Sequence, residues 1–335
     1  AGQCPIKVNV PEFRSRFLEL YHRRYLRPLR DYLIGSLEFS LPLLAHLPRL
    51  YNAPMGSRLV STLLAERLGM VDSPTISDFD FRATCRRFAV QTATPKRLAA
   101  MDESLRARSL ILVQDAFTRY FETPLLAAFI DLAHRLGHRV FLAPYSANGK
   151  PLHVQGFLGA FAKAAIRNGT QLKALADCGV PLVGLDPAMT LVYRQEYQKV
   201  PGLEDCPKVL LPQEWLMDAL PEQAAANAGS FRLMAHCTEK TNVPASTKQW
   251  EQVFARLGLK LVTEATGCCG MSGTYGHEAR NQETSRTIFE QSWATKLDKD
   301  GEPLATGYSC RSQVKRMTER KMRHPLEVVL QYAQR

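Results

Sequence analysis

Two adjacent cysteines stand between two glycines in the segment Gly267-Cys268-Cys269-Gly270. Core packing does not explain this arrangement, because a buried structural cysteine needs no neighbouring thiol. Glycine has no Cβ atom, so the backbone at these positions can approach a bound group closely or adopt a positive φ. Thiolates are soft ligands that select zinc, copper(I) or iron–sulfur clusters. The segment is therefore a candidate metal or cluster site.

Two further cysteines bracket this pair, Cys237 before it and Cys310 after it, so four thiols lie in three short segments. The chain carries eight cysteines in 335 residues, and no secretory signal is recognised at its start. Ligands or free thiols are therefore expected rather than a disulfide framework. This use of cysteine predicts a cytoplasmic protein.

Composition predicts a soluble globular protein, with 45% hydrophobic and 22% charged residues. The net charge of +11 can steer acidic partners or favour an anionic membrane surface. No nucleic-acid reading motif accompanies that charge, so no nucleic-acid partner is expected. Neither a G-x-G-x-x-G fingerprint nor a P-loop occurs, so neither FAD nor NAD is expected to bind within these residues.

Residues 1–106 are expected to form a helical extension. Apolar side chains recur at helical spacing over residues 9–70, and arginines cover much of the remaining surface. Basic amphipathic helices either pack on protein or lie on a membrane. Packing is the favoured interpretation, and peripheral contact with the inner face of a membrane is the alternative. Residues 71–106 are expected to be an irregular connection.

From residue 107 onward, strand-like and helix-like segments alternate, which predicts a mainly parallel sheet with helices on its faces. The same order recurs later in the chain, where residues 256–261 align with residues 135–140 at an offset of 121. We therefore predict an α/β fold with two tandem copies of one βα unit. The first copy spans residues 107–227 and the second spans residues 228–335.

The first copy has no thiol at the positions aligned with the four cysteines, which are Ala116, Ala147, Asn148 and Ala188. The fold therefore does not require these thiols, and they form one functional set. Each of them follows the end of a predicted strand, and that edge of an open parallel sheet is where binding sites form. We expect the three thiol segments to converge on one pocket in the second copy.

The spacing of Cys237, Cys268-Cys269-Gly270 and Cys310 resembles the CCG cysteine-rich domain. That domain usually occurs as a tandem repeat, in the B subunit of heterodisulfide reductase and in the iron–sulfur subunits of glycolate and glycerol-3-phosphate dehydrogenases. The resemblance implies an iron–sulfur cluster, of [4Fe–4S] type, on the four cysteines. The family motif ends C-x-x-C, but Gln313 occupies its last position here. This departure argues against the non-cubane cluster of the reductase.

The chain opens Ala1-Gly2-Gln3-Cys4-Pro5, and Cys-Pro is how a bacterial ferredoxin cluster run ends. Cys4 is therefore interpreted as the last ligand of a ferredoxin motif that begins upstream. Together with the CCG pattern, this makes the chain similar to the C-terminal part of a FAD and iron–sulfur D-2-hydroxyacid dehydrogenase. The 2-hydroxyglutarate and D-lactate enzymes of that family are the two types considered.

In this family, FAD in an upstream domain takes a hydride from the hydroxy acid, and iron–sulfur centres pass the electrons on singly. The resemblance thus implies that the full-length protein is an oxidoreductase, that these residues alone are inactive, and that none of them is catalytic. The implied partners are the upstream FAD and ferredoxin domains of the same polypeptide and an electron acceptor, either a quinone or a carrier protein. Whether the protein also forms a homo-oligomer is left open by the sequence.

Three interpretations of the thiol set are weighed. An iron–sulfur cluster is favoured, because the side chains of adjacent cysteines diverge and suit several iron positions better than one ion. A zinc or a bare thiol set in a structural or docking module is the second interpretation. The third is thiol–disulfide chemistry like that of the heterodisulfide reductases. The remaining cysteines after Cys4, namely Cys85, Cys178 and Cys206, fit no ligand spacing.

Several neighbours of the thiols are candidates for tuning the site. Gly267 and Gly270 would let the backbone approach a bound group. His236 and His277 would donate hydrogen bonds to sulfur or serve as ligands, although hydrogen-bonded loop histidines are an equally good interpretation. Arg311 would offset the negative charge of a cluster, to which cluster potentials respond.

Overall fold

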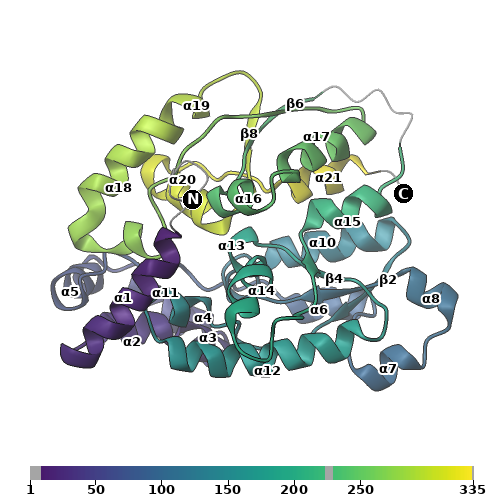
Figure 1. The fold of residues 1–335 in the computed structure, drawn as a ribbon. Helices are drawn as coiled ribbons and strands as arrows, with labels where there is room; N and C mark the ends of the chain where they lie inside the picture. Colours follow the sequence, from purple (N-terminus) through teal and green to yellow (C-terminus); the bar gives the residue numbers. More distant parts are fainter. Residues whose placement is uncertain (1–8, 223–228, 334–335) are drawn as a thin grey trace.

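The computed structural model describes residues 9–222 and 229–333 (Figure 1). Cys4, the expected ferredoxin ligand, lies outside the described residues. The described part contains two parallel sheets with helices packed on their faces, so the predicted α/β class is confirmed. Among these residues, no helix is both long and apolar enough to cross a bilayer.

Within residues 9–222, the first sheet has five strands in the order β1-β3-β2-β4-β5, and every neighbouring pair is parallel. The central strand β2 is apolar and buried at every position, which is typical of a strand covered on both faces. The elements of the first copy are β2 (Ser109–Val113), α9 (Ala116–Tyr120), α10 (Thr123–Arg135), β3 (Arg139–Leu142), α11 (Lys150–Val154), α12 (Leu158–Ala176), β4 (Leu182–Gly184), α13 (Pro187–Thr190), α14 (Val192–Gln195), η1 (Tyr197–Lys199), β5 (Val209–Leu210) and α15 (Pro212–Ala219).

Within residues 229–333, the second sheet has three parallel strands in the order β7-β6-β8. This is the order of β3-β2-β4 in the first sheet, so the predicted tandem repeat is confirmed. The elements of the second copy are β6 (Ser230–Met234), α16 (Cys237–Asn242), α17 (Ser246–Arg256), β7 (Lys260–Thr263), η2 (Tyr275–His277), η3 (Ala279–Asn281), α18 (Gln282–Phe289), the π-helix η4 (Glu290–Ala294), α19 (Thr295–Leu297), β8 (Glu302–Ala305), α20 (Tyr308–Thr318) and α21 (Pro325–Tyr332).

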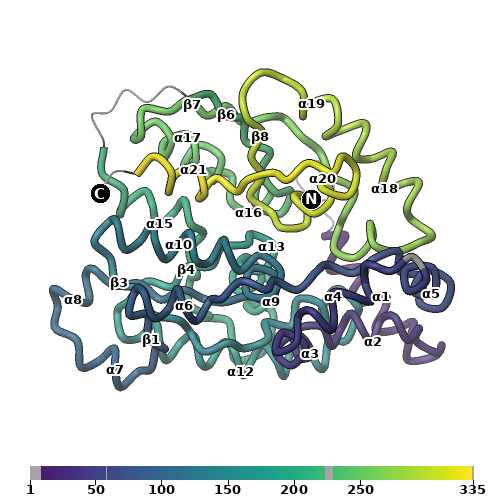
Figure 2. Tube along the Cα trace, turned by 180° about the vertical axis from the view of Figure 1, so that it is seen from behind, coloured from purple at the N-terminus to yellow at the C-terminus, as the bar shows by residue number. Residues whose placement is uncertain are grey.

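The N-terminal extension is helical, as expected. Figures 1 and 2 show its helices gathered at one end of the molecule, on the side of α18. They are α1 (Val10–Arg24), α2 (Leu29–Gly35), α3 (Leu37–Leu44), α4 (Pro48–Met55) and α5 (Arg58–Leu68). The expectation of an irregular connection over residues 71–106 is wrong, because that segment contains α6 (Phe81–Arg87), β1 (Gln91–Thr92), α7 (Pro95–Ala99) and α8 (Glu103–Ala107).

The two copies share one hydrophobic core. Helices α10 and α15 lie between the two sheets, next to α17 and α21 (Figure 1). Phe129 and Trp215 from the first copy belong to the same buried cluster as Phe231, Trp250 and Leu326 from the second. Because these large side chains are withdrawn from water together, the copies are expected to unfold as one unit.

Candidate metal centre

The three thiol segments follow the three strands of the second sheet. Cys237 is the first residue of α16, directly after β6, and Cys310 lies in the first turn of α20, after β8. Cys268 and Cys269 lie in the loop after β7. The strands are parallel neighbours, so their carboxyl ends share one edge of the sheet. The fold thereby brings together segments that are far apart in the sequence.

At this edge the thiols form a chain of contacts. The Cys269 thiol lies within hydrogen-bonding reach of the thiols of both Cys268 and Cys310. Cys237 lies close enough to Cys268 for their charges to interact. Cys269 and Cys310 are buried in an apolar cluster with Trp293, whereas Cys237 is exposed. The thiol set therefore runs from the protein interior to the surface.

Crowding and burial discourage the thiols of Cys237, Cys268 and Cys269 from ionising. Contact with Cys269 and then burial raise the pKa of Cys268 far above its ordinary value. Cys237 is exposed as a residue, but the protein around its sulfur atom partly removes water from the thiol, and this desolvation and then the nearby Cys268 raise its pKa. The pKa of Cys269 is also raised, because contact with Cys310 and burial outweigh the lowering effect of Cys268. A bound cation would reverse this balance, since a coordinating metal deprotonates its thiols.

Backbone N–H groups of the thiol loop point at sulfur. The N–H of Gly270 donates to Cys268 Sγ at 3.3 Å. The backbone groups of Ser272 and Met271 lie near Cys268 and Cys269, respectively, and each lowers the pKa of its thiol. Such donors stabilise thiolate and cluster sulfur. The turn that aims them requires a φ of +90° at Gly270, a conformation that glycine adopts at little cost.

The two glycines that flank the cysteines are held by the helix that covers the loop. The Gly270 carbonyl accepts a hydrogen bond from Ser285 Oγ at 2.9 Å. The N–H of Gly267 donates to Ser292 Oγ at 2.6 Å, and its carbonyl accepts from the Trp293 indole at 3.3 Å. The protein's own backbone and side chains therefore account for the missing Cβ atoms. Whether a bound group also approaches these glycines stays a prediction.

His236 caps the helix that carries the first thiol. Its Nδ1 accepts the N–H of Thr238 at 3.2 Å, and its Nε2 lies 3.3 Å from Ser309 Oγ, next to Cys310. Burial, assisted by the positive charges of Lys150, Arg311 and Lys240, lowers the pKa of His236 to about 4. A neutral ring with both nitrogens engaged ties α16 to α20. His236 thus positions two of the thiols.

The other two candidates have partners outside the thiol cluster. His277 Nδ1 lies 2.6 Å from Asp72 Oδ1, in the segment that follows α5. Arg311 is buried, donates to the Ala305 carbonyl at 2.7 Å and forms an ion pair with Glu122 of the first copy. Its pKa is raised by Glu122, although burial acts in the opposite direction. The guanidinium joins the two copies.

Lys240 is a charged neighbour of the thiols that the sequence analysis missed. It lies on α16, one turn after Cys237, and its ammonium group donates to Thr266 Oγ1 at 3.0 Å, just before the thiol loop. Burial lowers the pKa of Lys240, while the proximity of Cys237 and Cys310 raises it. The spacing of three residues on one helix was the available signal, because such residues share a face.

The corresponding place in the first copy is filled by a carboxylate. Glu38, from α3, accepts the N–H of Asn148 at 3.2 Å and that of Gly149 at 2.7 Å. Asn148 and Gly149 are the residues aligned with Cys269 and Gly270. The N–H of Gly270, which faces sulfur in the second copy, therefore has an aligned counterpart in the N–H of Gly149, which faces an acidic side chain. Burial raises the pKa of Glu38 to about 8, although both N–H groups lower it.

This contact predicts a pH-dependent stability. Between pH ~5 and pH ~8, folded Glu38 keeps a proton that the unfolded chain has released, so stability falls as pH rises. Glu38→Gln cannot ionise, and its single amide oxygen still accepts one of the two N–H groups, so it should remove a pH-dependent loss of stability of a few kcal/mol, at about 1.4 kcal/mol per pKa unit. Urea unfolding at several pH values measures this. The exposed Glu66→Gln on α5 is the control, and an unchanged slope in Glu38→Gln would contradict the assignment.

Within the described residues, no three His, Cys, Asp or Glu side chains are already arranged around a single metal ion. The four thiols are instead spread along the sheet edge, from buried Cys310 to exposed Cys237. Their role as ligands stays a prediction from the chemistry of the donor set.

The chain is similar in sequence to several known proteins. No family model matches the chain. All of its residues align with D-2-hydroxyglutarate dehydrogenase of Pseudomonas putida at 86% identity, and 98% of them align with the protein of that name from Escherichia coli K12 at 44% identity. The chain spans about one third of the length of these relatives, 33% in both cases.

A more distant relative is matched over most of its own length. The C subunit of the anaerobic glycerol-3-phosphate dehydrogenase of Escherichia coli K12 is 24% identical over 98% of this chain, and the match covers 83% of that protein. The resemblance predicted from the cysteine pattern is thereby confirmed: this chain is similar along its whole length to one part of the longer D-2-hydroxyglutarate dehydrogenases.

Proposed function

We propose that Cys237, Cys268, Cys269 and Cys310 hold an iron–sulfur cluster of [4Fe–4S] type, and that the chain is the electron-transfer part of a flavin-dependent dehydrogenase. The observation that carries this proposal is the meeting of three thiol segments at the edge of the second sheet, where Cys269 contacts both Cys268 and Cys310. The aligned edge of the first copy has no thiol and is filled by Glu38.

The chemistry of the donor set fits a cluster. Four thiols supply soft ligands, N–H groups of the loop face two of the sulfur atoms, and the Lys240 ammonium group lies near two of the thiols. A cluster offers ligand positions on several iron atoms, which suits the adjacent Cys268 and Cys269 better than one tetrahedral ion. When bound, such a cluster stores and passes on single electrons.

The residues around the proposed cluster would have different roles. Cys269 and Cys310 would hold the group in an apolar cluster that excludes water, while exposed Cys237 would leave one edge near the surface. His236 fixes the helix ends that carry Cys237 and Cys310. Lys240 would favour the more negative, reduced state. None of these residues is proposed to touch the organic substrate.

The longer relatives support a role within a larger enzyme. Two of them, from Pseudomonas putida and Escherichia coli, are named D-2-hydroxyglutarate dehydrogenase. We therefore infer an oxidoreductase that oxidises a D-2-hydroxy acid, with 2-hydroxyglutarate preferred over lactate. FAD and a ferredoxin-type domain would lie in other parts of the polypeptide, and a quinone or carrier protein would accept the electrons. A cytoplasmic location follows from this chemistry of reduced thiols.

Metal and sulfide analysis tests this proposal. The longer polypeptide, purified anaerobically, should contain iron and acid-labile sulfide, and its visible band should bleach on adding D-2-hydroxyglutarate. D-lactate is the comparison substrate. Stoichiometric zinc without a visible band would instead identify a structural module. Disulfide reduction that depends on Cys268 would identify thiol–disulfide chemistry.

Removing the charge of Lys240 should make a bound cluster harder to reduce. Lys240→Gln is expected to lower the reduction potential by tens of millivolts, because a nearby cation stabilises the added electron. Redox titration followed by electron paramagnetic resonance measures this shift. Lys315→Gln is the matched control, since Lys315 is exposed on α20, the helix that carries Cys310. Equal potentials in the two variants would contradict the role of Lys240.

A further inference from the structure

Helix α1 is polar where it meets the rest of the protein. The only buried residue of α1 is Ser15. Arg14 donates to the Val154 carbonyl at 2.8 Å, and Arg27 donates to the Gly156 carbonyl at 3.2 Å. The backbone of α1 passes so close to Gly156 that a Cβ atom there would lie 2.8 Å from Ser15 O. The helix is firmly seated through polar contacts.

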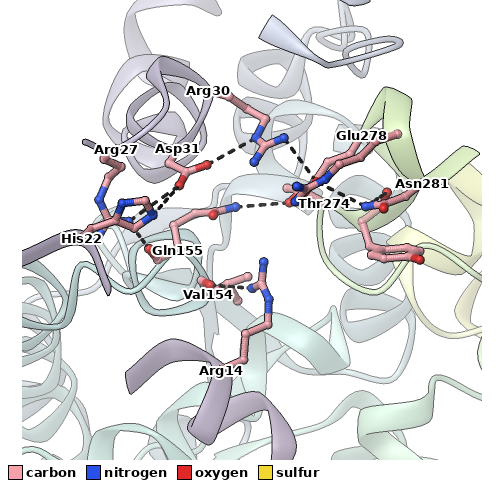
Figure 3. A network of polar contacts seen from close by, with 12 residues as sticks. Arg14, His22, Arg27, Arg30, Asp31, Val154, Gln155, Thr274, Glu278 and Asn281 are labelled. Carbon is pink, nitrogen blue, oxygen red and sulfur yellow. Dashed lines mark hydrogen bonds and ion pairs between the residues drawn. The ribbon is translucent and has the colours of Figure 1, made fainter. Parts of the chain in front are cut away.

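An ion-pair network fixes the same helices to the second copy (Figure 3). Asp31 lies between two arginines of the extension, 3.8 Å from Arg27 and 3.3 Å from Arg30. Arg30 also reaches the buried carboxylate of Glu278 at 3.3 Å. The N–H of Val71, just after α5, donates to the His277 carbonyl at 2.9 Å. The extension is thus joined to the segment that follows the thiol loop.

The outer face of these helices is apolar. Phe13, Phe17, Leu20 and Tyr21 recur along α1 at helical spacing, and the Phe13 side chain is 65% exposed. Leu26, between α1 and α2, is 98% exposed. Of the 20 large hydrophobic side chains that are exposed among the described residues, 18 lie in residues 10–79. A helix with polar contacts inside and aromatic rings outside is reversed relative to a free surface helix.

The apolar face ends at a groove with a basic rim. Tyr32, Phe39 and Phe157 line a groove of about 320 Å³, together with Lys163 and Arg167 from α12. Both cations are exposed. The face therefore fits a protein surface that offers apolar side chains and carboxylates, which also suits the net charge of +11.

We propose that the outer face of α1 and α2, with this groove, is the docking surface for the remainder of a longer polypeptide. The chain spans 33% of the relatives that it matches at 86% and 44% identity, so about twice its own length is available as the occupant. Exposed apolar patches of this extent mark interaction sites. Arg16 and Arg23 of α1 are exposed beside the rings, so binding to a membrane is an outcome that the test below must separate from this proposal.

Hydroxyl-radical footprinting tests the proposal. The chain alone is compared with a longer polypeptide in which it replaces the matching third of the Pseudomonas putida protein. Oxidation of Phe13, Phe17 and Tyr21 should fall at least about fivefold in the longer protein, because docking excludes water from these rings. Oxidation of Val262, a 46% exposed side chain on β7, should stay unchanged. Equal oxidation of the three rings in both proteins would overturn the proposal.

A charge placed on the face separates the alternative occupants. Phe17→Glu in the longer protein should restore oxidation of Phe13 and Tyr21 without changing the sedimentation mass, while Val262→Glu should do neither. A fall in mass would identify a second copy as the occupant and overturn the proposal. Flotation of the longer protein with vesicles of phosphatidylglycerol and phosphatidylethanolamine, abolished by Phe17→Glu, would likewise overturn it in favour of a membrane. Iron content, measured in the same samples, reports on the cluster independently.

Discussion

Replacing Cys269 by serine should lower the iron and acid-labile sulfide of the anaerobically purified protein to less than about a tenth of the wild-type content. Cys269 is the thiol that contacts two others, Cys268 and Cys310, and it is buried among apolar side chains. A serine hydroxyl is a harder and less acidic ligand than a thiol. Apolar neighbours in that cluster, such as Trp293 and Phe289, offer no ligand in place of the lost sulfur.

The control for this variant is Cys178→Ser. Cys178 is partly buried on the first copy, and its thiol donates to the carbonyls of Pro95 and Ala174, away from the second sheet. It should retain the full iron and sulfide content. If Cys269→Ser and Cys178→Ser both keep the cluster, the four cysteines are not its ligands. If neither variant nor the wild type contains sulfide, the cluster proposal fails at once.

Much of the fold was accessible from the sequence, because buried central strands leave a strong pattern. Residues 109–113 are five residues without a strongly polar interruption after Ser109, and the structure has β2 at those positions. The edge strands β1 and β5 have two residues each, too few to show any periodicity. They form only because a neighbouring strand is already in place to pair with them, and the local sequence does not encode that tertiary contact.

The helices in residues 71–106 were missed although the sequence carries signals for them. Asp80, Thr94 and Asp102 cap α6, α7 and α8 through hydrogen bonds from backbone N–H groups to their side chains. Capping residues of this kind predict a helix start even where the helix has only five to seven residues. Hydrophobic periodicity does not reveal such short helices, because it needs a longer window of residues.

After the thiol loop, the α-helix begins only at Gln282, and a π-helix follows it directly. The reason is tertiary. Met70 pairs with Glu278, and the N–H of Ala279 donates to the Gly69 carbonyl at 2.8 Å. These contacts with the end of α5 hold the segment after the thiol loop in two short 3-10 turns instead of an α-helix, which local propensity does not encode.

For the site, the meeting of the thiol segments followed from strand order, because carboxyl ends of parallel strands share an edge. Partners of the charged residues did not follow from the sequence. Arg311 was expected to face the thiols. Its guanidinium group instead donates a hydrogen bond to the carboxylate of Glu122, which lies 189 residues away in the sequence. Lys240, which does lie near Cys237 and Cys310, resembles any helix lysine until the fold places it.

Gly270→Ala should destabilise the protein by roughly 3–5 kcal/mol, through strain and a backbone clash together. Gly270 has a φ of +90°, which an alanine adopts only under strain. Its new Cβ atom would also lie 2.3 Å from the Ser285 carbonyl oxygen on α18. Either the helix or the thiol loop must shift, so the N–H of Gly270 would move away from Cys268. Urea unfolding monitored by tryptophan fluorescence measures the loss.

Gly273→Ala is the matched control for this prediction, because it separates backbone strain from the clash. Gly273 also has a positive φ, +67°, but a Cβ atom there would lie 3.7 Å from Val154, at ordinary contact distance. It should therefore cost about 1 kcal/mol from strain alone. The difference between the two variants measures how tightly α18 holds the thiol loop against the sheet edge. Equal losses in the two variants would show that the loop yields freely, and a loop that yields freely could not keep three thiols in contact.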